Sequence, residues 1–393
     1  MKTIFKNILV GILGWQVKRL YKKHNFKTIG IVGSIGKTST KLAIAKVLES
    51  DKRVRYQKGN YNDIVSVPLI FFGQKMPTLF NALAWFGIII KNEFQITSNF
   101  PFDIVVVELG TDAPGQIIKF KKYLLLDIAV VTAVTPEHME FFKTLEAVMV
   151  EEWNVRFFSK KIFANRDLCQ ILPLDLNSNQ VKFYSKLDQN YRLKTFSQAE
   201  NYSASAAVSV AKYLKISKEK ISKALNEISN FAGRMQKLKG IKNSIIIDDS
   251  YNSSPQALKM ALDAIYAFET SQRIAILGMM NELGEMSESE HRKVGEYCKP
   301  ELLDWVITIG RDANAFLALA ARSQGCQVYE SRDALDAGNF AKEKIREKAV
   351  VLVKGSQNGV FTEEAIKPLL ANRADISKLV RQDKKWMDKK NKG

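Results

Sequence analysis

The sequence predicts an α/β protein with two domains, each built on a parallel sheet. Three observations lead to this prediction. Short runs of consecutive apolar residues recur along the chain, as in strands that are buried on both faces. Segments with apolar residues at helical spacing separate these runs. The runs also fall into two sets, one on each side of Gly233-Arg234, which we take as the linker between the domains.

The apolar runs define the predicted strands, and the segments between them define the helices. The strands of the first set are 27–32, 104–107 and 128–131, and those of the second set are 245–247, 274–277, 306–309 and 350–353. The predicted helices include 40–50, 201–214 and 255–268. We therefore predict an N-terminal helix at 1–26, a central domain at 27–232, a Rossmann-like C-terminal domain at 233–375 and a basic tail at 376–393.

A glycine-rich loop follows the first predicted strand and precedes a predicted helix. Its candidate nucleotide-binding residues are Gly33, Ser34, Gly36, Lys37, Thr38 and Ser39. In such a loop, backbone N–H groups bind phosphate oxygens, the lysine reaches the terminal phosphates and the threonine hydroxyl binds Mg²⁺. Because Ile31 stands where the generic motif has glycine, this is the shorter Gly-x-x-Gly-Lys-Thr form. The central domain is thus predicted to be a P-loop-type parallel-sheet ATPase domain.

Two further residues with catalytic chemistry follow predicted strands of the first set. Glu108 ends the strand 104–107, and His138 lies shortly after the strand 128–131. The carboxyl ends of parallel strands meet at the edge of the sheet where α/β proteins bind ligands. We therefore expect both residues near the phosphate loop. The alternatives are a glutamate that faces water and a histidine with a structural role.

The loop Gly33–Thr40, together with Glu108 and His138, resembles the Mur ligase family, and the resemblance covers residues 27–370. It implies ATP-dependent formation of a carbon–nitrogen bond through an acyl phosphate, with ATP and Mg²⁺ as cofactors. Members of this family bind Mg²⁺ through the glutamate of a Glu-x-Gly motif and through a loop histidine. The resemblance therefore implies that Glu108 and His138 are catalytic metal ligands, together with Lys37 as a catalytic residue and Thr38 as a metal ligand.

One departure from the family concerns the second metal site. The family usually has a carbamoylated lysine where Glu152 stands, beside Glu151. A glutamate supplies a carboxylate without modification, so we infer that Glu152 is the catalytic residue and metal ligand there. Glu151 is the alternative after a slip of one residue, and a charged helix face is the third interpretation.

Other family motifs provide nucleotide-binding candidates. They are an asparagine that leads a small-residue helix, a Gly-Arg linker and an Asp-Asp-Ser-Tyr-Asn segment. The resemblance implies nucleotide contacts from Asn201, Arg234, Asp249, Tyr251 and Asn252. It further implies that the domains close over ATP through Arg234 and Asp249.

Within the family, the segment 277–291 is similar to the branch that adds D-alanyl-D-alanine to UDP-muramoyl-tripeptide. The substrate-binding candidates that this branch suggests are Asn60, Asn62, Glu282, His291 and Lys354. Full-length members of the branch carry an N-terminal domain for the uridine nucleotide, whereas residues 1–26 are too few for a domain. The sequence therefore leaves open how the substrate is held and which carboxylate and amine are joined.

Two other functions compete with this interpretation. A ligase of the same family could join a different carboxylate and amine, such as a polyglutamate-like or cyanophycin-like pair. A non-catalytic P-loop binding protein is the third possibility. Lys37, Glu108, His138 and Arg234 together argue against the last, because a scaffold does not need all four.

Composition narrows the classes of partner. The net charge of +18 could suit nucleic acid, an anionic membrane or an anionic small substrate. Because no zinc finger or RNA-recognition signature is present, we predict no binding to nucleic acid. The family resemblance implies an anionic muramoyl peptide and an amine such as D-Ala-D-Ala as substrates. Scattered cysteines at 169, 298 and 326 and the lack of a signal-peptide pattern favour the cytoplasm, and we expect a monomer.

Two apolar segments leave the question of membrane contact open. Residues 4–15 have helical spacing and precede a basic run at 18–23, and residues 79–90 are almost entirely apolar. Neither segment is long enough to span a bilayer. We favour packing of both on the first domain. The alternatives are an interfacial helix on an anionic membrane for 4–15 and an exposed apolar face for a lipid or partner for 79–90.

Overall fold

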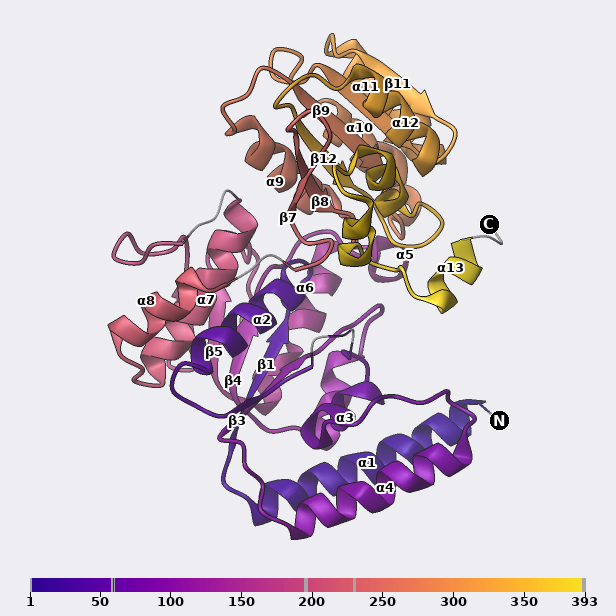
Figure 1. The fold of residues 1–393 in the computed structure, drawn as a ribbon. Coiled ribbons are helices and arrows are strands. Elements are labelled where there is room, and N and C mark those ends of the chain that lie inside the picture. The colour runs from indigo at the N-terminus through magenta and orange to yellow at the C-terminus, as the bar shows by residue number, and fades with distance from the viewer. Residues whose placement is uncertain (1, 58, 60, 194–196, 229–230, 391–393) are drawn as a thin grey trace. The chain divides into compact units, whose positions relative to one another are not determined.

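The computed structural model describes residues 2–57, 59, 61–193, 197–228 and 231–390. The chain forms two compact units, drawn in Figure 1. The first unit comprises 1–135, 142–194 and 200–228, and the second comprises 136–141, 195–199 and 229–393. Two short segments of the predicted central domain thus group with the second unit, and so does the predicted basic tail.

The first unit contains a sheet of six parallel strands in the order β2-β3-β1-β4-β5-β6. Its strands are β1 (Lys27–Val32), β2 (Val54–Arg55), β3 (Ile104–Glu108), β4 (Leu126–Val131), β5 (Ser159–Asn165) and β6 (Val181–Tyr184). The three long apolar strands that the sequence predicted are adjacent in the centre of the sheet. The prediction missed the outer strands because β2 has only two residues and exposed residues interrupt β5 and β6.

Helices cover the central strands of this sheet. The helices of the unit are α1 (Lys2–Lys23), α2 (Lys37–Leu48), α3 (Ser66–Phe72), α4 (Ala82–Thr97), α6 (Leu145–Trp153), α7 (Gln198–Tyr213) and α8 (Lys218–Asn226), with the 3₁₀ turns η1 (Ile117–Lys122) and η2 (Asn154–Phe158). Ile29 and Ile31 of β1, which alternate toward one face, pack with the apolar sides of α2, α7 and α8 in the main core.

Helices α1 and α4 lie side by side at one edge of this unit (Figure 1). Leu13 of α1 and Trp85 of α4 join Leu69 of α3 in a second, smaller apolar cluster. Nearby, the Gln16 amide donates to the Ile89 carbonyl at 3.0 Å. The N-terminal helix is therefore packed on the first unit through one of its sides.

The second unit contains a six-stranded sheet in the order β11-β10-β9-β12-β8-β7. Its strands are β7 (Gln236–Lys239), β8 (Ile245–Asp249), β9 (Arg273–Gly278), β10 (Trp305–Ile309), β11 (Val328–Ser331) and β12 (Val350–Lys354). All neighbours pair in parallel except β7 and β8, which are antiparallel. The predicted α/β class is confirmed in both units.

Helices also flank this second sheet. They are α5 (Met139–Phe142), α9 (Pro255–Tyr266), α10 (Ser287–Gly295), α11 (Ala318–Ser323), α12 (Ala334–Lys344) and α13 (Lys384–Lys390), with the shorter turns η3 (Gly284–Met286), η4 (Ala313–Leu317), η5 (Thr362–Leu369) and η6 (Arg373–Lys378). The α12 and η5 segments share one apolar core with alternate residues of the central strands. Among the described residues, no helix is both long enough and apolar enough to cross a membrane.

Candidate active site

The phosphate loop predicted from the sequence joins β1 to α2. Gly33 and Gly36 have φ angles of 126° and 81°, in the left-handed region that favours glycine. A Cβ atom on Gly33 would lie 2.2 Å from the Thr132 Oγ1 atom. Both conformation and space therefore require glycine at the start of the loop.

Residues after β4 hold this loop in place. The Thr132 hydroxyl donates to the Ile35 carbonyl at 2.6 Å. The Ser34 N–H donates to the Ala133 carbonyl at 3.0 Å, and the Ser34 hydroxyl accepts from the Thr135 N–H at 2.8 Å. Ser34, which was expected to bind phosphate, therefore fixes the loop through both of these groups.

The catalytic lysine and the predicted metal ligands meet where α2 begins. The Lys37 ammonium folds over the loop and donates to the carbonyls of Gly33 and Ser34. The Thr38 hydroxyl lies 3.2 and 3.1 Å from the two oxygens of Glu108, which ends β3 and is buried. A hydroxyl and a carboxylate are oxygen donors of the kind that Mg²⁺ prefers. Ser39 lies in the same first helical turn and is half-buried.

A buried lysine that the sequence did not single out completes this group. Lys41 Nζ lies 3.0 Å from Glu108 Oε2, and the two side chains are only 1% and 4% exposed. Lys41 stands one helical turn after Lys37, so both ammonium groups come from one side of α2. A lysine inside a buried helical segment was the available signal, because an unpaired charge is not found there.

Helix α6 places two glutamates in different surroundings. The Glu152 carboxylate is buried and accepts a hydrogen bond from the Gly33 N–H at 2.6 Å. Glu151 instead accepts from the N–H groups of Gly115, Gln116 and Ile117 at 2.6–2.7 Å, where η1 begins. Of the two candidates, Glu152 is the one that reaches the phosphate loop, and neither is a charge on a solvated helix face.

The predicted catalytic histidine belongs to the second unit. His138 has a φ of 51° and pairs through Nδ1 with the carboxylate of Glu282, whose φ is 64°. The hydrogen bond from His138 lowers the pKa of Glu282. The Glu140 N–H also donates to the Glu282 carbonyl at 3.0 Å. The structure thus brings together a predicted catalytic residue and a predicted substrate residue.

The Asp-Asp-Ser-Tyr-Asn segment lies at the end of β8, beside the Gly-Arg linker. Lys354 Nζ lies 2.7 Å from Asp249 Oδ2 and donates to the Asn252 carbonyl at 2.9 Å. The Arg234 guanidinium stacks over the Tyr251 ring at 4.1 Å. Its Nε is buried and has no hydrogen-bond partner among the described residues, a donor that an anionic ligand could satisfy.

The first aspartate of this segment, Asp248, is fully buried. Its Oδ1 accepts from the N–H and the hydroxyl of Ser250 at 3.0 and 2.5 Å. Burial raises the pKa of Asp248 to about 6.

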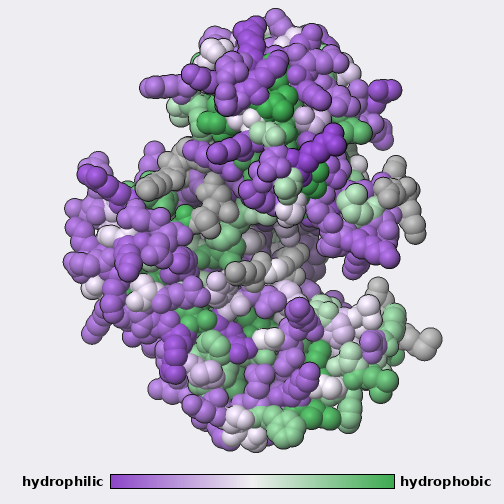
Figure 2. Space-filling view, viewed as in Figure 1, coloured by the Kyte–Doolittle hydropathy of each residue, from purple (hydrophilic) through white to green (hydrophobic). Residues whose placement is uncertain are grey.

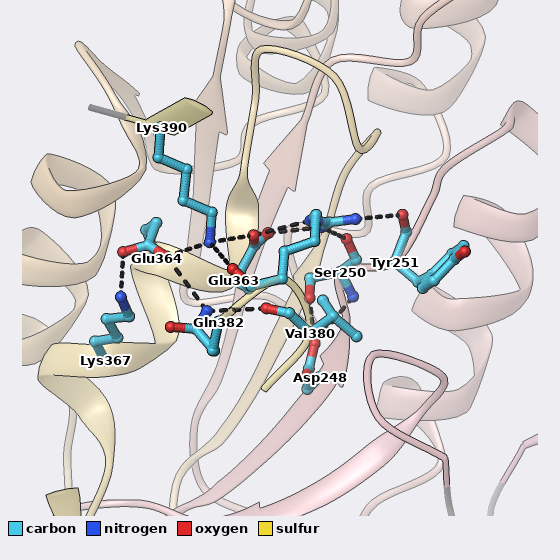
Figure 3. A network of polar contacts seen from close by, with 10 residues as sticks. Asp248, Ser250, Tyr251, Glu363, Glu364, Lys367, Val380, Gln382 and Lys390 are labelled. Carbon is cyan, nitrogen blue, oxygen red and sulfur yellow. Dashed lines mark hydrogen bonds and ion pairs between the residues drawn. The ribbon is translucent and has the colours of Figure 1, made fainter. Parts of the chain in front are cut away.

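The C-terminal segment supports this loop through a buried ion network, drawn in Figure 3. The Arg381 guanidinium donates to the carbonyls of Ser250 and Tyr251 at 2.6 and 3.0 Å and to the Glu363 carboxylate at 2.6 and 2.9 Å. Lys390 Nζ lies 2.7 Å from Glu363 Oε1. The sequence does not reveal this network, because a basic tail is usually solvated and the carbonyl groups that Arg381 binds lie 130 and 131 positions away in the chain.

The remaining predicted residues have varied surroundings. His291 is fully buried, and it accepts from the Met280 N–H at 2.9 Å while Nδ1 lies 2.7 Å from the Ser287 carbonyl. Burial lowers the pKa of His291, and the His291 ring supports the loop that contains Glu282.

The three asparagine candidates lie elsewhere. The Asn201 side chain accepts from the Leu187 N–H at 2.7 Å. Asn62 lies against Gly110, whose N–H donates to its carbonyl at 2.8 Å. Asn60 lies outside the described residues.

Within the residues that the structure describes, no three histidine, cysteine, aspartate or glutamate side chains form a group that could hold a metal ion. Thr38 and Glu108 are the predicted metal ligands that hydrogen bond to one another. Glu152 contacts the first glycine of the phosphate loop, Gly33.

Comparison with known proteins agrees with this geometry. The Mur ligase middle domain matches residues 88–240, and the Mur ligase glutamate ligase domain matches residues 233–357. The UDP-N-acetylmuramoyl-tripeptide–D-alanyl-D-alanine ligase of Bacillus subtilis strain 168 is 27% identical over 380 residues, which span 88% of this chain and 76% of that protein.

Two solved structures show the same fold. MurF ligase from Thermotoga maritima in complex with ADP aligns with a TM-score of 0.68 at 20% identity, covering 91% of this chain and 84% of that one. Folylpolyglutamate synthase from Mycobacterium tuberculosis, complexed with ADP and AMPPCP, aligns with a TM-score of 0.65 at 14% identity, covering 93% and 94%.

Proposed function

Because the chain belongs to the Mur ligase family, we propose that it is an ATP-dependent ligase that adds D-alanyl-D-alanine to a muramoyl tripeptide during peptidoglycan synthesis. The curated relative from Bacillus subtilis carries this activity in its name. The observation that carries the proposal is the phosphate loop, where Lys37 and the Thr38–Glu108 pair meet at the start of α2. This arrangement suits phosphoryl transfer better than any other chemistry.

The reaction needs a phosphoryl transfer because a carboxylate has no good leaving group. The γ-phosphoryl group of ATP passes to the substrate carboxylate and gives an acyl phosphate and ADP. The amine then attacks the acyl carbon, the amide bond forms, and inorganic phosphate leaves with the carbon–oxygen bond electrons. Such transfers depend mainly on positioning and on neutralising charge, which the loop can supply.

Each residue of the loop has a distinct role in this proposal. The backbone of Gly36 and Thr38 binds phosphate oxygens at the helix N-terminus, and the Lys37 ammonium moves from its carbonyl partners to the terminal phosphates. Thr38 and Glu108 would hold Mg²⁺, which neutralises charge on the phosphates when bound. Lys41 fixes the Glu108 carboxylate toward Thr38. Glu152 holds the first glycine of the loop and is the proposed substitute for the carbamoylated lysine.

The second unit contributes residues of its own. We propose that Arg234 binds a phosphate group through its buried Nε donor, and that Asp249 and Asn252 are held for nucleotide contact by Lys354. Lys354 is itself buried, so its role is to position these residues rather than to meet a muramoyl peptide. His138 and Glu282 form a hydrogen-bonded pair that would orient the substrate.

The experiment is a coupled measurement of phosphate release and product mass. Purified protein is incubated with ATP, Mg²⁺, UDP-muramoyl-tripeptide and D-Ala-D-Ala, with single omissions as controls. The expected product is the muramoyl pentapeptide, with one phosphate released for each amide formed. Lack of any product with a protein that binds ATP would contradict the proposed substrates, and Glu108→Gln is the inactive control.

The second candidate is a ligase that extends a glutamate-containing acceptor. Folylpolyglutamate synthase from Mycobacterium tuberculosis shares the fold of this chain. The same assay with glutamate and a polyglutamate acceptor distinguishes the two candidates, because the mass of the product identifies the amine.

A further inference from the structure

Helices α1 and α4 form a pair whose two sides differ in what they contact. They run in the same direction: Phe5 stacks on Phe80 near their starts, and Lys23 Nζ donates to the Thr97 carbonyl at their ends, at 3.0 Å. Their inner sides pack together and on α3. The outer sides of both helices are consequently exposed.

The outer sides carry large apolar residues at the spacing of one helical face. On α1 these are Ile4, Ile8 and Trp15, which are 54–66% exposed, and on and just before α4 they are Phe80, Leu83, Phe86, Ile90 and Phe94, which are 40–86% exposed. Figure 2 shows hydrophobic residues gathered over this part of the surface. Soluble monomers rarely leave such a continuous apolar patch without a partner. We call these residues the helix-pair face.

The charge around the helix-pair face has one sign. Lys18 and Lys22 continue the exposed stripe of α1 beyond Trp15, and Lys91 is exposed on α4. Glu93 is the single acidic residue in the sequence between 74 and 102, and none occurs before position 49. Arg19 pairs with Glu93, so its charge is already compensated. The face is therefore apolar with a positively charged margin.

We propose that the helix-pair face binds the surface of an anionic lipid bilayer. Apolar side chains on a helix that lies in the interface enter the acyl boundary, and the lysines stay with the negatively charged headgroups. A second copy of the chain fits less well, because a symmetric contact would bring together two copies of the same positively charged margin, and Glu93 of the face already pairs with Arg19. Binding to lipid does not require ATP or ligation, so the inference stands apart from the proposed function.

Gly11 provides a sharp test of this inference. It lies on the exposed stripe between Ile8 and Trp15, and a Cβ atom placed there meets nothing within 4 Å. Gly11→Glu therefore adds a negative charge to the centre of the face without a clash, and Gly11→Ala is its matched control.

The assay is sedimentation of the full-length protein with lipid vesicles over a range of salt concentrations. The vesicles contain phosphatidylcholine alone or phosphatidylcholine mixed with phosphatidylglycerol.

We expect binding to the vesicles that contain phosphatidylglycerol and a decrease in binding as salt increases. Gly11→Glu should weaken the affinity about tenfold or more, whereas Gly11→Ala should retain it. Leu83→Glu should act like Gly11→Glu, whereas Leu335→Glu, at an apolar site on α12 that is 53% exposed, should not.

Charge reversal tests the positive margin in the same assay. Lys18→Glu with Lys22→Glu should weaken binding, and Lys218→Glu with Lys223→Glu on α8 changes the net charge equally as a control. Circular dichroism checks that each variant is folded. Equal binding of Gly11→Glu and Gly11→Ala, or no binding of the parent protein to either vesicle, would overturn the proposal. A dimer in solution that Gly11→Glu dissociates, without vesicle binding, would identify a self-association surface instead.

Discussion

Replacing Lys41 with methionine tests the buried ion pair beside the phosphate loop. Lys41 Nζ lies 3.0 Å from Glu108 Oε2, and both side chains are almost fully buried. Methionine keeps most of the volume of the side chain but removes the ammonium, so Glu108 loses its buried cation. Removing one partner of a buried pair costs about 3–5 kcal/mol of stability, because the remaining charge stays in a poorly solvated place.

A double-mutant cycle separates this charge effect from lost packing. Glu108→Gln in the Lys41→Met background removes the remaining charge, so the double variant should be more stable than the Lys41→Met variant. The expected coupling energy is about 2 kcal/mol or more, with the sign of a favourable pair in the parent protein. Lys46→Met on the same helix is the matched control. Lys46 Nζ lies 2.9 Å from Glu227 Oε2, and the Glu227 side chain is 50% exposed. Such surface pairs contribute about 1 kcal/mol or less of stability.

Unfolding in urea is measured by hydrogen exchange and mass spectrometry, because peptides from α2 and β3 then report the stability of the first unit separately. Activity is a second measurement, in which Lys41→Met should raise the Mg²⁺ concentration needed for half-maximal turnover. If Lys41→Met costs less than about 1 kcal/mol, or if the two substitutions are additive, the pair does not hold Glu108 as we argue.

Three further predictions concern individual residues. Lys37→Ala should abolish ligation without unfolding the protein, because it removes the charge that follows the transferred phosphoryl group; near-normal turnover in the steady-state assay would refute the assignment. Glu152→Gln should slow turnover and raise the Mg²⁺ concentration needed for half-maximal turnover, because it removes a charged metal ligand. The parent enzyme should need no bicarbonate, since glutamate is already ionised at neutral pH; a requirement for bicarbonate in CO₂-depleted buffer would argue against Glu152 as the substitute for the carbamoylated lysine. Asp248 has a folded-state pKa of about 6, raised above the unfolded value by burial. The parent protein should therefore gain about 2 kcal/mol of stability relative to Asp248→Asn as the pH falls from 7.5 to 4. Urea unfolding measures both proteins, and a stability difference that stays constant across this range would refute the prediction.

The sequence predicted the residues that follow the central strands but not the residues that hold them. Gly33, Lys37 and Glu108 are visible because strand, loop and helix fix their spacing along the chain. Lys41 stands in a buried helical segment, which indicates a charged partner, but the sequence does not show that this partner is Glu108, 67 positions away. Periodicity describes which side of a helix is buried, and it does not reveal which distant charge lies opposite.

The same limit explains the two glutamates of α6. From the sequence, Glu151 and Glu152 are alternatives, because the family motif fixes the position of this side chain only to within one residue. In the structure, adjacent helical residues point about 100° apart, so only one of them can face the phosphate loop. Glu152 does so, and Glu151 accepts three N–H groups where η1 begins. Glu151→Gln and Glu152→Gln should therefore have different effects on the phosphate loop.

Buried charges outside the predicted site set the geometry of the residues inside it. Arg381 binds the carbonyls of Ser250 and Tyr251, and Glu363 compensates the charge of Arg381. Tyr251 in turn stacks under Arg234, the proposed phosphate ligand. A buried ion pair is costly to desolvate and adds little net stability, so its benefit here is the fixed position of the loop. Substitutions of Arg381 or Glu363 should therefore weaken nucleotide affinity, although both residues lie far from the phosphate loop along the chain.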